Sequence, residues 1–489
     1  MIKSPHLRPV LPPAFISRLS AQFPKEHQEI IDALDRPPNA SVLLNPEKQL
    51  AIATQGLESA TDNGSLPIPR LAWLLPIDWC PHGRILSARP SFTLDPLFHA
   101  GCYYAQESSS MFLWHILSTL NYQLSPDSYR DINCLDLCAA PGGKSLLLSS
   151  YFDDKAKIIS NEVIPQRNAV LRENVTKWGA ANVIVTRNNP ADFSSLENYF
   201  DLVLIDAPCS GEGMFRKDHR ARNEWSEENV RMCSVRQRRI LNDVLGCVSP
   251  GGYLIYSTCT FSSDENEENC RWLCGLGLEK VMFDVPKNWN LDVLDEKEFF
   301  AVRMLPHRVA GEGFFVSVFR VPAKEQFPHR EVSGRRREEK RSGRFTNASN
   351  RENEIASKWM QGKTGLVMDS KEDALFLSSF HFDELNHLSK QLHITLPGIE
   401  VGRLVRDELI PAHALAVSGL VNENISRIVV NEETALRYLR GENISSSVEN
   451  ISTEGWALMA FNEHPLGWIK IMKNRVNNYY PKNWRVRMR

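Results

Sequence analysis

The residues Leu202-Val203-Leu204-Ile205-Asp206-Ala207-Pro208-Cys209 form an apolar run that ends in a carboxylate and a thiol. A second β-prone run, Gly251–Tyr256, is followed in the same way by Ser257-Thr258-Cys259. If both runs are strands of one parallel sheet, their carboxyl ends meet at the edge where α/β sheets bind ligands. The alternative is that both cysteines are packing residues, because free cysteine is among the most buried residue types. Their positions in the loops after the strands favour a chemical site.

Segments on both sides of this stretch alternate between strand-like and helix-like patterns. Short aliphatic and β-branched runs predict strands, and the longer segments between them predict helices. The alternation implies parallel βαβ units, so we predict an α/β fold with a doubly wound, Rossmann-like sheet. The predicted strands are Ile132–Leu137, Ile158–Ser160, Val183–Thr186, Leu202–Ile205, Leu254–Tyr256 and Gly313–Phe319, and the predicted helices are Leu146–Phe152, Pro165–Lys177 and Glu227–Val248.

The chain of 489 residues has room for roughly three domains. Residues 1–110, rich in Pro, are predicted to form an N-terminal α+β extension, and the βα segments define a catalytic domain at 111–322. Residues 323–354 are predicted to be a basic linker, because a Ser-, Gly- and Asn-containing stretch there has a basic excess. Residues 355–489 are predicted to be a β-rich C-terminal region with a hairpin that turns at Asn462–Pro465.

The composition excludes several classes of protein. No apolar run approaches the roughly 20 residues of a membrane span, and the N-terminal sequence lacks the apolar segment of a secretion signal. The ten cysteines include no CxxC pair, which argues against a zinc ribbon or a disulfide framework. We therefore expect a monomeric cytoplasmic protein that has no structural metal and no contact with membranes.

The end of the chain has the composition of an RNA-binding segment. Although the formal net charge is −2, the residues from Lys470 to Arg489 include seven basic side chains and no acidic one. Tyr479, Tyr480 and Trp484 lie among them. Basic groups contact phosphates and aromatic faces stack on unpaired bases, so the tail is predicted to bind RNA. A solvated basic terminus is the alternative.

A glycine-rich turn lies between the first predicted strand and its helix. The turn consists of Cys138, Ala139, Ala140, Pro141, Gly142, Gly143 and Lys144. Such a turn brings free N–H groups and a partial positive charge to a ligand's anionic group. The G-x-G-x-x-G pattern of dinucleotide folds is absent, whereas Gly143-Lys144-Ser145 matches the end of a P-loop that lacks its first glycine. The third interpretation is S-adenosylmethionine, for which Glu162 can accept hydrogen bonds from ribose hydroxyls.

Two cysteines favour the methyl donor, because phosphoryl transfer has no use for thiols. Carbon 5 of cytosine becomes nucleophilic after a thiolate attacks carbon 6, and a second thiol can assist the later release of the enzyme. The attacking thiol needs positive surroundings, for which Lys144, Arg216 and Lys217 are candidates. Asp206 is placed to bond the exocyclic amine that distinguishes cytosine from uracil. The target base must be flipped out or unpaired.

The motifs resemble those of the NOL1/NOP2/Sun family of RNA cytosine-C5 methyltransferases. The matching stretches are YAQESSSM (104–111), LDLCAAPGGKS (135–145), DAPCSGEGMFRKD (206–218) and YSTCTFSSDENE (256–267). The resemblance implies that Cys259 is the nucleophile and that Cys209 assists release. It also implies that Cys138–Lys144, Glu162 and Asp206 contact S-adenosylmethionine. The family's adenine-contacting aspartate is replaced here by Asn188-Asn189, so we place Asn189 in the cofactor site and leave Asn188 and Asp192 open.

The resemblance also implies a substrate. The layout is similar to that of bacterial members that methylate 16S ribosomal RNA and carry a PUA-like RNA-binding module, so 16S rRNA or the 30S subunit is the expected partner. One family position differs, because Leu43 stands where the N-terminal S-x-R-x-N pattern has arginine. Three alternatives remain open: the same chemistry on transfer RNA, a P-loop-like NTPase, and a non-catalytic RNA-binding factor for ribosome assembly.

Overall fold

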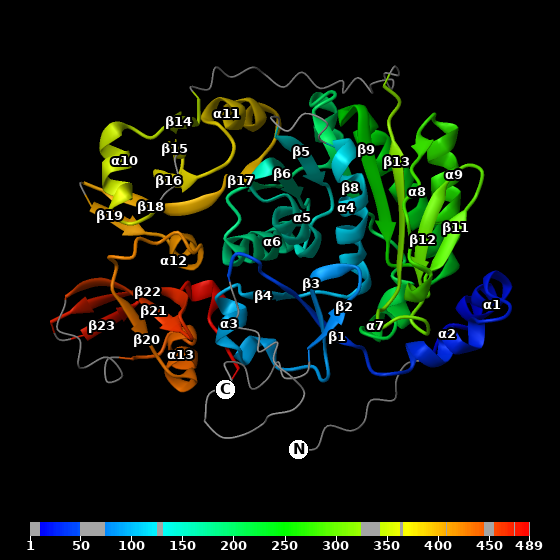
Figure 1. Ribbon diagram of the computed structural model, residues 1–489, viewed down its shortest axis with the longest axis horizontal. Coiled ribbons are helices and arrows are strands. Elements are labelled where there is room, and N and C mark those ends of the chain that lie inside the picture. The colour runs from blue at the N-terminus through cyan, green and yellow to red at the C-terminus, as the bar shows by residue number, and fades with distance from the viewer. Residues whose placement is uncertain are drawn as a thin grey trace.

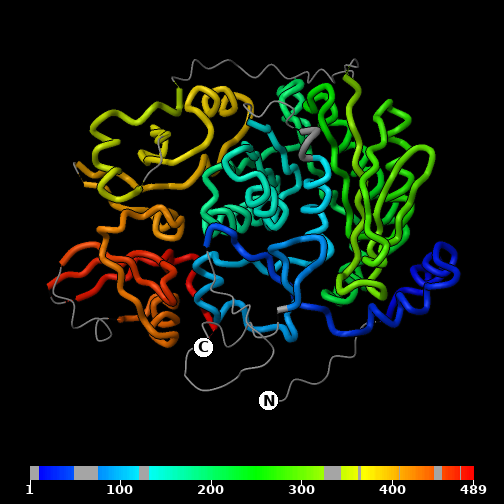
Figure 2. Tube along the Cα trace, in the orientation of Figure 1, coloured from blue at the N-terminus to red at the C-terminus, as the bar shows by residue number. Residues whose placement is uncertain are grey.

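The structure is a computed structural model that describes residues 10–48, 74–124, 131–323, 343–361, 365–406, 408–444, 454–473 and 475–488. These residues form four sheets with helices around them (Figure 1). The largest sheet has ten strands and lies at the centre, the N-terminal sheet lies beside it, and the two C-terminal sheets lie on one side (Figure 2).

The central sheet follows the order β11-β12-β13-β9-β8-β5-β6-β7-β17, with β10 (Glu279–Lys280) paired to β13. From β9 to β7 all neighbours are parallel, and antiparallel strands complete both edges. The predicted doubly wound α/β fold is therefore confirmed. The strands are β5 (Ile132–Asp136), β6 (Ala156–Asn161), β7 (Val183–Thr186), β8 (Phe200–Asp206), β9 (Val248–Thr258), β11 (Asp292–Asp295), β12 (Phe300–Met304), β13 (Phe314–Arg320) and β17 (Ile394–Leu396).

Helices cover both faces of this sheet because its strands are apolar on both sides. In β8, Leu202 and Leu204 pack on one face, while Val203 and Ile205 pack on the other. The first face is covered by α4 (Leu113–Leu124), α5 (Gly143–Phe152) and α6 (Pro165–Trp178), and the second by α8 (Glu227–Val244), α9 (Glu267–Gly275) and α11 (Phe382–Gln391). Helix α8 is shorter than predicted, because Val248 pairs with Phe200 and begins β9.

The N-terminal region forms an antiparallel sheet of order β2-β3-β1-β4 and a separate helix pair. Phe15 and Ile30 of the helix pair pack against Phe215 and Phe261, close to the cysteine loops. The elements are α1 (Pro13–Gln22), α2 (His27–Leu34), β1 (Ala40–Leu44), β2 (Leu74–Ile77), β3 (Cys80–Leu86), α3 (Pro96–His99) and β4 (Tyr103–Ala105). Leu43, which stands in place of the family arginine, is fully buried in the core.

The C-terminal region contains two sheets, of order β14-β15-β16-β18-β19 and β20-β21-β22-β23. The predicted hairpin is confirmed as β21 and β22. The strands are β14 (Phe345–Asn347), β15 (Leu366–Asp369), β16 (Ala374–Leu377), β18 (Ile399–Val405), β19 (Glu408–Pro411), β20 (Arg427–Val429), β21 (Gly455–Phe461), β22 (His464–Met472) and β23 (Arg475–Asn478). The remaining helices are α7 (Arg220–Glu224), α10 (Asn350–Ser357), α12 (His413–Val417) and α13 (Glu432–Leu439).

Two predictions for this part of the chain need correction. The predicted linker, residues 323–354, lies largely outside the described residues, but its last part forms β14 and begins α10, where Ser349 and Glu352 make a capping box. The region beyond the linker is not separate from the predicted catalytic domain, because β17 adds a strand to its sheet beside β7. Ile394 and Leu396 in β17 are buried, and this burial offsets the shortness of the strand.

The end of helix α6 is the place where the three regions of the chain meet. Asn45 donates to the carbonyl of Trp178, and Lys48 donates to the carbonyls of Lys177 and Ala100. Gly101 (φ +70°) must be glycine here, because a Cβ would lie 1.8 Å from the Lys177 carbonyl oxygen. Capping of a helix end by a buried amide and a lysine satisfies carbonyls that have no partner within the helix.

The C-terminal tail reaches the same junction, which changes the interpretation of its aromatic residues. Tyr480 is buried, and its hydroxyl lies 3.2 Å from Nδ1 of His99. Trp484 packs beneath the ammonium group of Lys177. The Tyr480 ring is therefore unavailable for stacking on bases, so the prediction of base stacking is wrong for Tyr480. Trp484 is half-buried, and its stacking on bases stays a prediction. Tyr479 remains 42% exposed and packs against Trp456.

Candidate active site

The two cysteines predicted to meet at the carboxyl edge of the sheet do meet there. Strand β8 ends at Asp206 and β9 at Thr258, and the strands are parallel neighbours with Asp206 opposite Ser257. Cys209 and Cys259 lie in the loops that follow, with their Sγ atoms 3.3 Å apart. Both residues are partly exposed and their contact is part-buried, so the pair lies at the edge of the core and not within it.

The contact with Cys259 affects the ionisation of the Cys209 thiol. The contact with Cys259 and burial both raise the pKa of the Cys209 thiol well above its ordinary value. A protonated Cys209 can donate a hydrogen bond to the sulfur of Cys259, although either sulfur can be the donor in this contact. An S–H donor stabilises a neighbouring thiolate, and the thiolate is the nucleophilic form of cysteine. The contact suits either sulfur as the attacking atom, so Cys259 as the nucleophile stays a prediction.

Lys144 provides the positive charge beside the thiols. Its ammonium lies 2.8 Å from the Asp206 carboxylate, which also accepts a hydrogen bond from the Ser257 hydroxyl. Burial acts to lower the pKa of Lys144, but the Asp206 carboxylate raises it, so the lysine stays charged. Of the other two candidate cations, Arg216 is paired in a buried salt bridge with Glu312, and Lys217 is exposed on the surface. Neither is positioned like Lys144.

The predicted turn joins β5 to α5 at the same edge of the sheet. Gly142 has φ +122° and precedes Gly143, the first residue of α5, so the turn uses a backbone conformation that side chains disfavour. Arg167 holds the turn by donating to the carbonyl of Ala140. Burial raises the pKa of the Cys138 thiol, which marks Cys138 as a packing residue within the turn and not a third nucleophile.

The P-loop interpretation does not fit the side chains that follow this turn. In a P-loop the serine hydroxyl holds magnesium and the lysine holds phosphates. Here the Ser145 hydroxyl is fully buried and donates to Asp136 at 2.6 Å, while Lys144 is paired with Asp206. Both groups already bond carboxylates of the protein and are not free to hold magnesium or phosphate, which argues against an NTPase.

Asp136 is a residue that sequence reasoning missed. It ends β5 and is fully buried, and its Oδ1 atom has no hydrogen-bond partner. Burial raises the pKa of Asp136 to about 7. A buried acceptor that lacks a partner beneath a cofactor turn fits a ligand that brings positive charge. The signal in the sequence was its place at the end of the first strand, before the glycine-rich turn.

The acidic and amide residues predicted to contact the ribose and adenine lie on the two strands beyond β5. Glu162 follows β6 and is 3% exposed, with one oxygen accepting from the N–H of Ile164 and the other 3.3 Å from Arg167. Asn188 follows β7 and is buried, with its amide bonded to Asp192 and its oxygen to the N–H of His393. Asn189 is exposed and caps a short helical turn, so it is the more accessible of the two asparagines.

S-adenosylmethionine fits the donor set at this edge. The ligand carries an ammonium, a sulfonium, a carboxylate and ribose hydroxyls. The partnerless Asp136 oxygen suits the positive groups, the N-terminus of α5 suits the carboxylate, and Glu162 suits the hydroxyls. Among the described residues, no group of three or more His, Cys, Asp or Glu side chains is arranged to hold a metal ion. Within the same residues, no helix has the length and apolar character needed to cross a membrane.

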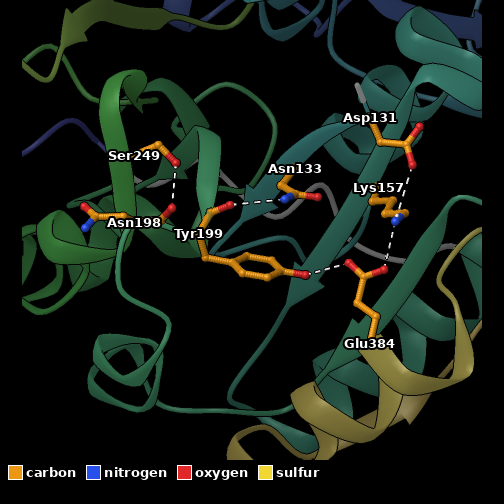
Figure 3. Close-up of a pocket in the computed structure, with 7 residues that line it drawn as sticks. All are labelled: Asp131, Asn133, Lys157, Asn198, Tyr199, Ser249 and Glu384. Carbon is orange, nitrogen blue, oxygen red and sulfur yellow. Dashed lines mark hydrogen bonds and ion pairs between the residues drawn. The ribbon is translucent and has the colours of Figure 1, made fainter. Parts of the chain in front are cut away.

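A polar pocket lies at the opposite, amino edge of the same sheet (Figure 3). Lys157 lies between Asp131 and Glu384, and Tyr199 donates to Glu384 at 2.7 Å. These groups satisfy one another and tie α11 to the sheet. The residues of this pocket therefore join two regions of the chain through polar contacts, on the side of the sheet away from the thiols. Its lining residues are Asp131, Asn133, Lys157, Asn198, Tyr199, Ser249 and Glu384.

Comparison with known families agrees with this geometry along most of the chain. Residues 122–320 match the family described as 16S rRNA methyltransferase RsmB/F. Residues 11–108 match the N-terminal domain of 16S rRNA methyltransferase RsmF, and residues 426–486 match the RsmF PUA domain. These matches cover the N-terminal region, the central sheet except for β17, and the second C-terminal sheet.

Individual relatives give the same result. The chain is 27% identical to ribosomal RNA small subunit methyltransferase F of Vibrio parahaemolyticus, over 98% of both chains. A methyltransferase homologue from Pyrococcus horikoshii is similar in structure (TM-score 0.50, 25% identity, 63% of this chain and 94% of the other). NSun6 from the same organism, solved with the S-adenosylmethionine analogue SFG, shares the fold (TM-score 0.50, 17% identity, 64% and 99%). The chain belongs to the RsmB/F family of 16S rRNA methyltransferases and is an S-adenosylmethionine-dependent RNA methyltransferase.

Proposed function

We propose that the protein methylates carbon 5 of a cytosine in 16S ribosomal RNA through a covalent adduct between Cys259 and carbon 6 of the base. The observation that carries the proposal is the 3.3 Å contact between the Cys209 and Cys259 sulfur atoms beside the Lys144–Asp206 pair. The choice of 16S rRNA is supported by the names of the relatives that match the whole chain.

The chemistry follows from the arrangement of these groups. The Cys259 thiolate forms a bond to carbon 6, which makes carbon 5 electron-rich. When bound, S-adenosylmethionine supplies the methyl group that carbon 5 takes. The proton on carbon 5 then leaves to solvent, the bond between sulfur and carbon 6 breaks, and the double bond of the ring is restored. Cys259 departs as a thiolate, and the S–H of Cys209 stabilises it by donating a hydrogen bond.

Each remaining site residue has a role in this scheme. Lys144 supplies a fixed positive charge near the thiolate, and Asp206 holds the lysine and lies where it can accept from the exocyclic amine of cytosine. Asp136, the turn at Cys138–Lys144, Glu162 and Asn189 hold the cofactor. The target base must leave its stack to reach the thiols, at a cost of roughly a few kcal/mol.

The other regions of the chain are proposed to bind RNA. In this proposal the chain divides near residues 110 and 322 into an N-terminal extension, a catalytic domain and a C-terminal region that includes β14 and adds β17 to the catalytic sheet. The C-terminal sheet that matches a PUA domain ends in exposed basic residues, among them Lys482 and Arg487. Phosphate contacts from such residues would add affinity that does not depend on the RNA sequence.

Methyl incorporation into purified RNA tests the substrate. The protein is incubated with labelled S-adenosylmethionine and, in separate reactions, with free 16S rRNA, 30S subunits and transfer RNA, and bisulfite sequencing then locates 5-methylcytosine. We expect incorporation at cytosine in 16S rRNA, free or in the subunit. Incorporation only into transfer RNA would overturn the choice of substrate. Binding of RNA without any incorporation would support a non-catalytic assembly factor.

Replacing each cysteine in turn tests the covalent mechanism. The Cys259→Ala protein is expected to lose methylation entirely and to form no adduct. The Cys209→Ala protein is expected to attack and methylate the base but to release it slowly, so a denaturing gel should show a shifted protein–RNA band. A shifted band for Cys259→Ala alone would assign the nucleophile to Cys209. Mild and equal losses of methylation in the two variants, with no shifted band, would indicate that both cysteines are packing residues.

A further inference from the structure

A buried carboxylate joins the two cysteine loops directly behind the thiols. Ser210 follows Cys209, and Thr260 follows Cys259. The Glu265 Oε1 atom accepts from the Ser210 N–H at 2.9 Å, and its Oε2 atom accepts from the Ser210 hydroxyl at 2.6 Å and the Thr260 hydroxyl at 3.4 Å. The two hydroxyl oxygens are 2.9 Å apart. One side chain therefore bonds the residue next to each cysteine.

Contacts with α8 and with the neighbouring loop hold the Glu265 side chain in place. Its side chain is fully buried, and Gln237 of α8 donates to Oε1 at 3.0 Å. The following residue, Asn266, accepts from the Thr258 hydroxyl and donates to the Thr260 carbonyl. The carboxylate therefore belongs to a network that fastens the loop after β9 to the sheet and to α8. Because Glu265 is buried behind the loops, it acts on the substrate only through the thiols.

The sheet alone does not determine the distance between the thiols. The paired strands end at Asp206 and Thr258, and Cys209 lies three residues beyond its strand. The N–H of Gly213 donates to the Cys259 carbonyl and provides a backbone link between the loops. The Glu212 carboxylate also links the loops, because it accepts from the Phe261 N–H at 2.9 Å. The Glu265 carboxylate adds a link at the two residues adjacent to the cysteines. Burial raises the pKa of Glu265 to about 7, and its charged form contributes to the raised pKa of Cys209 after the contact with Cys259 and burial.

We propose that Glu265 is a positioning residue that holds the Cys209 thiol against the Cys259 sulfur. The consequence for catalysis rests on the proposed function, in which the Cys209 S–H stabilises the departing Cys259 thiolate. Without the carboxylate the loops separate, the S–H···S contact weakens, and the Cys259 thiolate becomes a poorer leaving group. Loss of Glu265 therefore resembles a partial loss of Cys209: attack continues, and the covalent adduct accumulates.

The first test measures the thiol contact without RNA or cofactor. Diamide oxidises two thiols in contact to a disulfide and is itself reduced to the hydrazine, and mass spectrometry then quantifies the peptide linked through Cys209 and Cys259. We expect Glu265→Ala to slow formation of this disulfide by about tenfold or more. The Glu265→Gln protein keeps an acceptor for the Ser210 N–H and a donor for the hydroxyls, so we expect a rate within about threefold of the native rate.

Two further variants make this test decisive. Glu268→Ala is the control, because Glu268 lies on the same segment but is exposed and paired with Arg271, and it should leave the rate unchanged. Ser210→Ala removes the hydrogen bond from the Ser210 hydroxyl to Glu265. The rate of disulfide formation should then lie between those of the native protein and Glu265→Ala. If Glu265→Ala does not fold, as judged by its melting curve, Ser210→Ala decides the matter. Native rates in folded Glu265→Ala, or in Ser210→Ala where Glu265→Ala is unfolded, would overturn the proposal.

The second test measures the adduct with RNA and S-adenosylmethionine on a denaturing gel. We expect a shifted band for Glu265→Ala, weaker than that for Cys209→Ala, and none for Glu268→Ala or Glu265→Gln. Slow disulfide formation together with no band in any variant, Cys209→Ala included, would mean that Glu265 positions the thiols and that the release role of Cys209 is wrong. A band for Cys209→Ala but none for Glu265→Ala would overturn the catalytic consequence of the proposal.

Discussion

Replacing Asn45 with alanine should loosen the junction at the end of α6. The Asn45 side chain is 3% exposed, and its Nδ2 atom donates to the carbonyls of Gly101 at 3.0 Å and Trp178 at 2.9 Å. Its Oδ1 atom accepts from the N–H of Glu47. Alanine leaves two buried carbonyls without a donor, at about 1–3 kcal/mol each. The two carbonyls together give an expected loss of about 2–6 kcal/mol.

Hydrogen exchange measures this loss where it occurs. The free energy of opening should fall in the last turn of α6, and the midpoint of urea denaturation should fall with it. Asn353→Ala is the matched control, since Asn353 also donates to two carbonyls, those of Ala348 and Ser349, but is exposed on α10. Water replaces its bonds, so we expect a change below about 0.5 kcal/mol. Equal losses in the two variants would refute the argument that burial sets the magnitude.

Three further predictions concern the cofactor, pH and RNA. Glu162→Ala should weaken binding of S-adenosylmethionine by about 1–3 kcal/mol on calorimetry, and unchanged affinity would remove Glu162 from the site. The pKa of Asp136, raised by burial to about 7, means that its protonated form stabilises the folded apo protein below about pH 4 and that this stability is lost as the pH rises through 7. Between pH 4 and pH 8 this group should lower the free energy of unfolding of the native protein by at most about 4 kcal/mol. An asparagine side chain cannot titrate, so the Asp136→Asn protein should lack this fall and show a flatter pH dependence in urea unfolding. Replacing Lys482 and Arg487 with alanine should reduce the salt dependence of RNA binding by a slope of up to about two, without changing cofactor affinity, and an unchanged slope would make the tail a solvated terminus.

The central sheet could be predicted from the sequence because its strands are buried on both faces. Runs such as Leu202–Ile205 are apolar at every position, and each is followed by loop residues that carry chemistry. Strand β17 could not be predicted in the same way. It contains three residues, and its burial comes from β7, which lies more than two hundred positions earlier in the chain. Short strands at the edges of sheets depend on such distant partners more than on their own pattern.

Part of the candidate site could be predicted for similar reasons, and part of it could not. The positions of Cys209 and Cys259 after adjacent strands placed them together, and the glycines of the turn indicated a cofactor. The roles of Arg216 and Tyr480 depend on partners that spacing does not reveal: Glu312 in one case and the junction at α6 in the other. Glu265 lies in an acidic run, residues 264–268, whose composition predicts exposure to solvent. Only the fold shows that Glu265 is buried.

The contacts between regions bear on how RNA reaches the thiols. One buried apolar cluster contains side chains from both ends of the chain, including Leu97, Tyr103, Leu439 and Val486. Apolar interfaces of this kind resist relative motion, whereas polar ones permit it. The pairing of β17 with β7 and the Lys157–Glu384 bond add further ties on the other side of α6. The C-terminal sheets should therefore keep a fixed position relative to Cys259. If they bind the RNA backbone, the target cytosine must come to the thiol by leaving its stack, because the domain that holds the RNA does not swing toward the site.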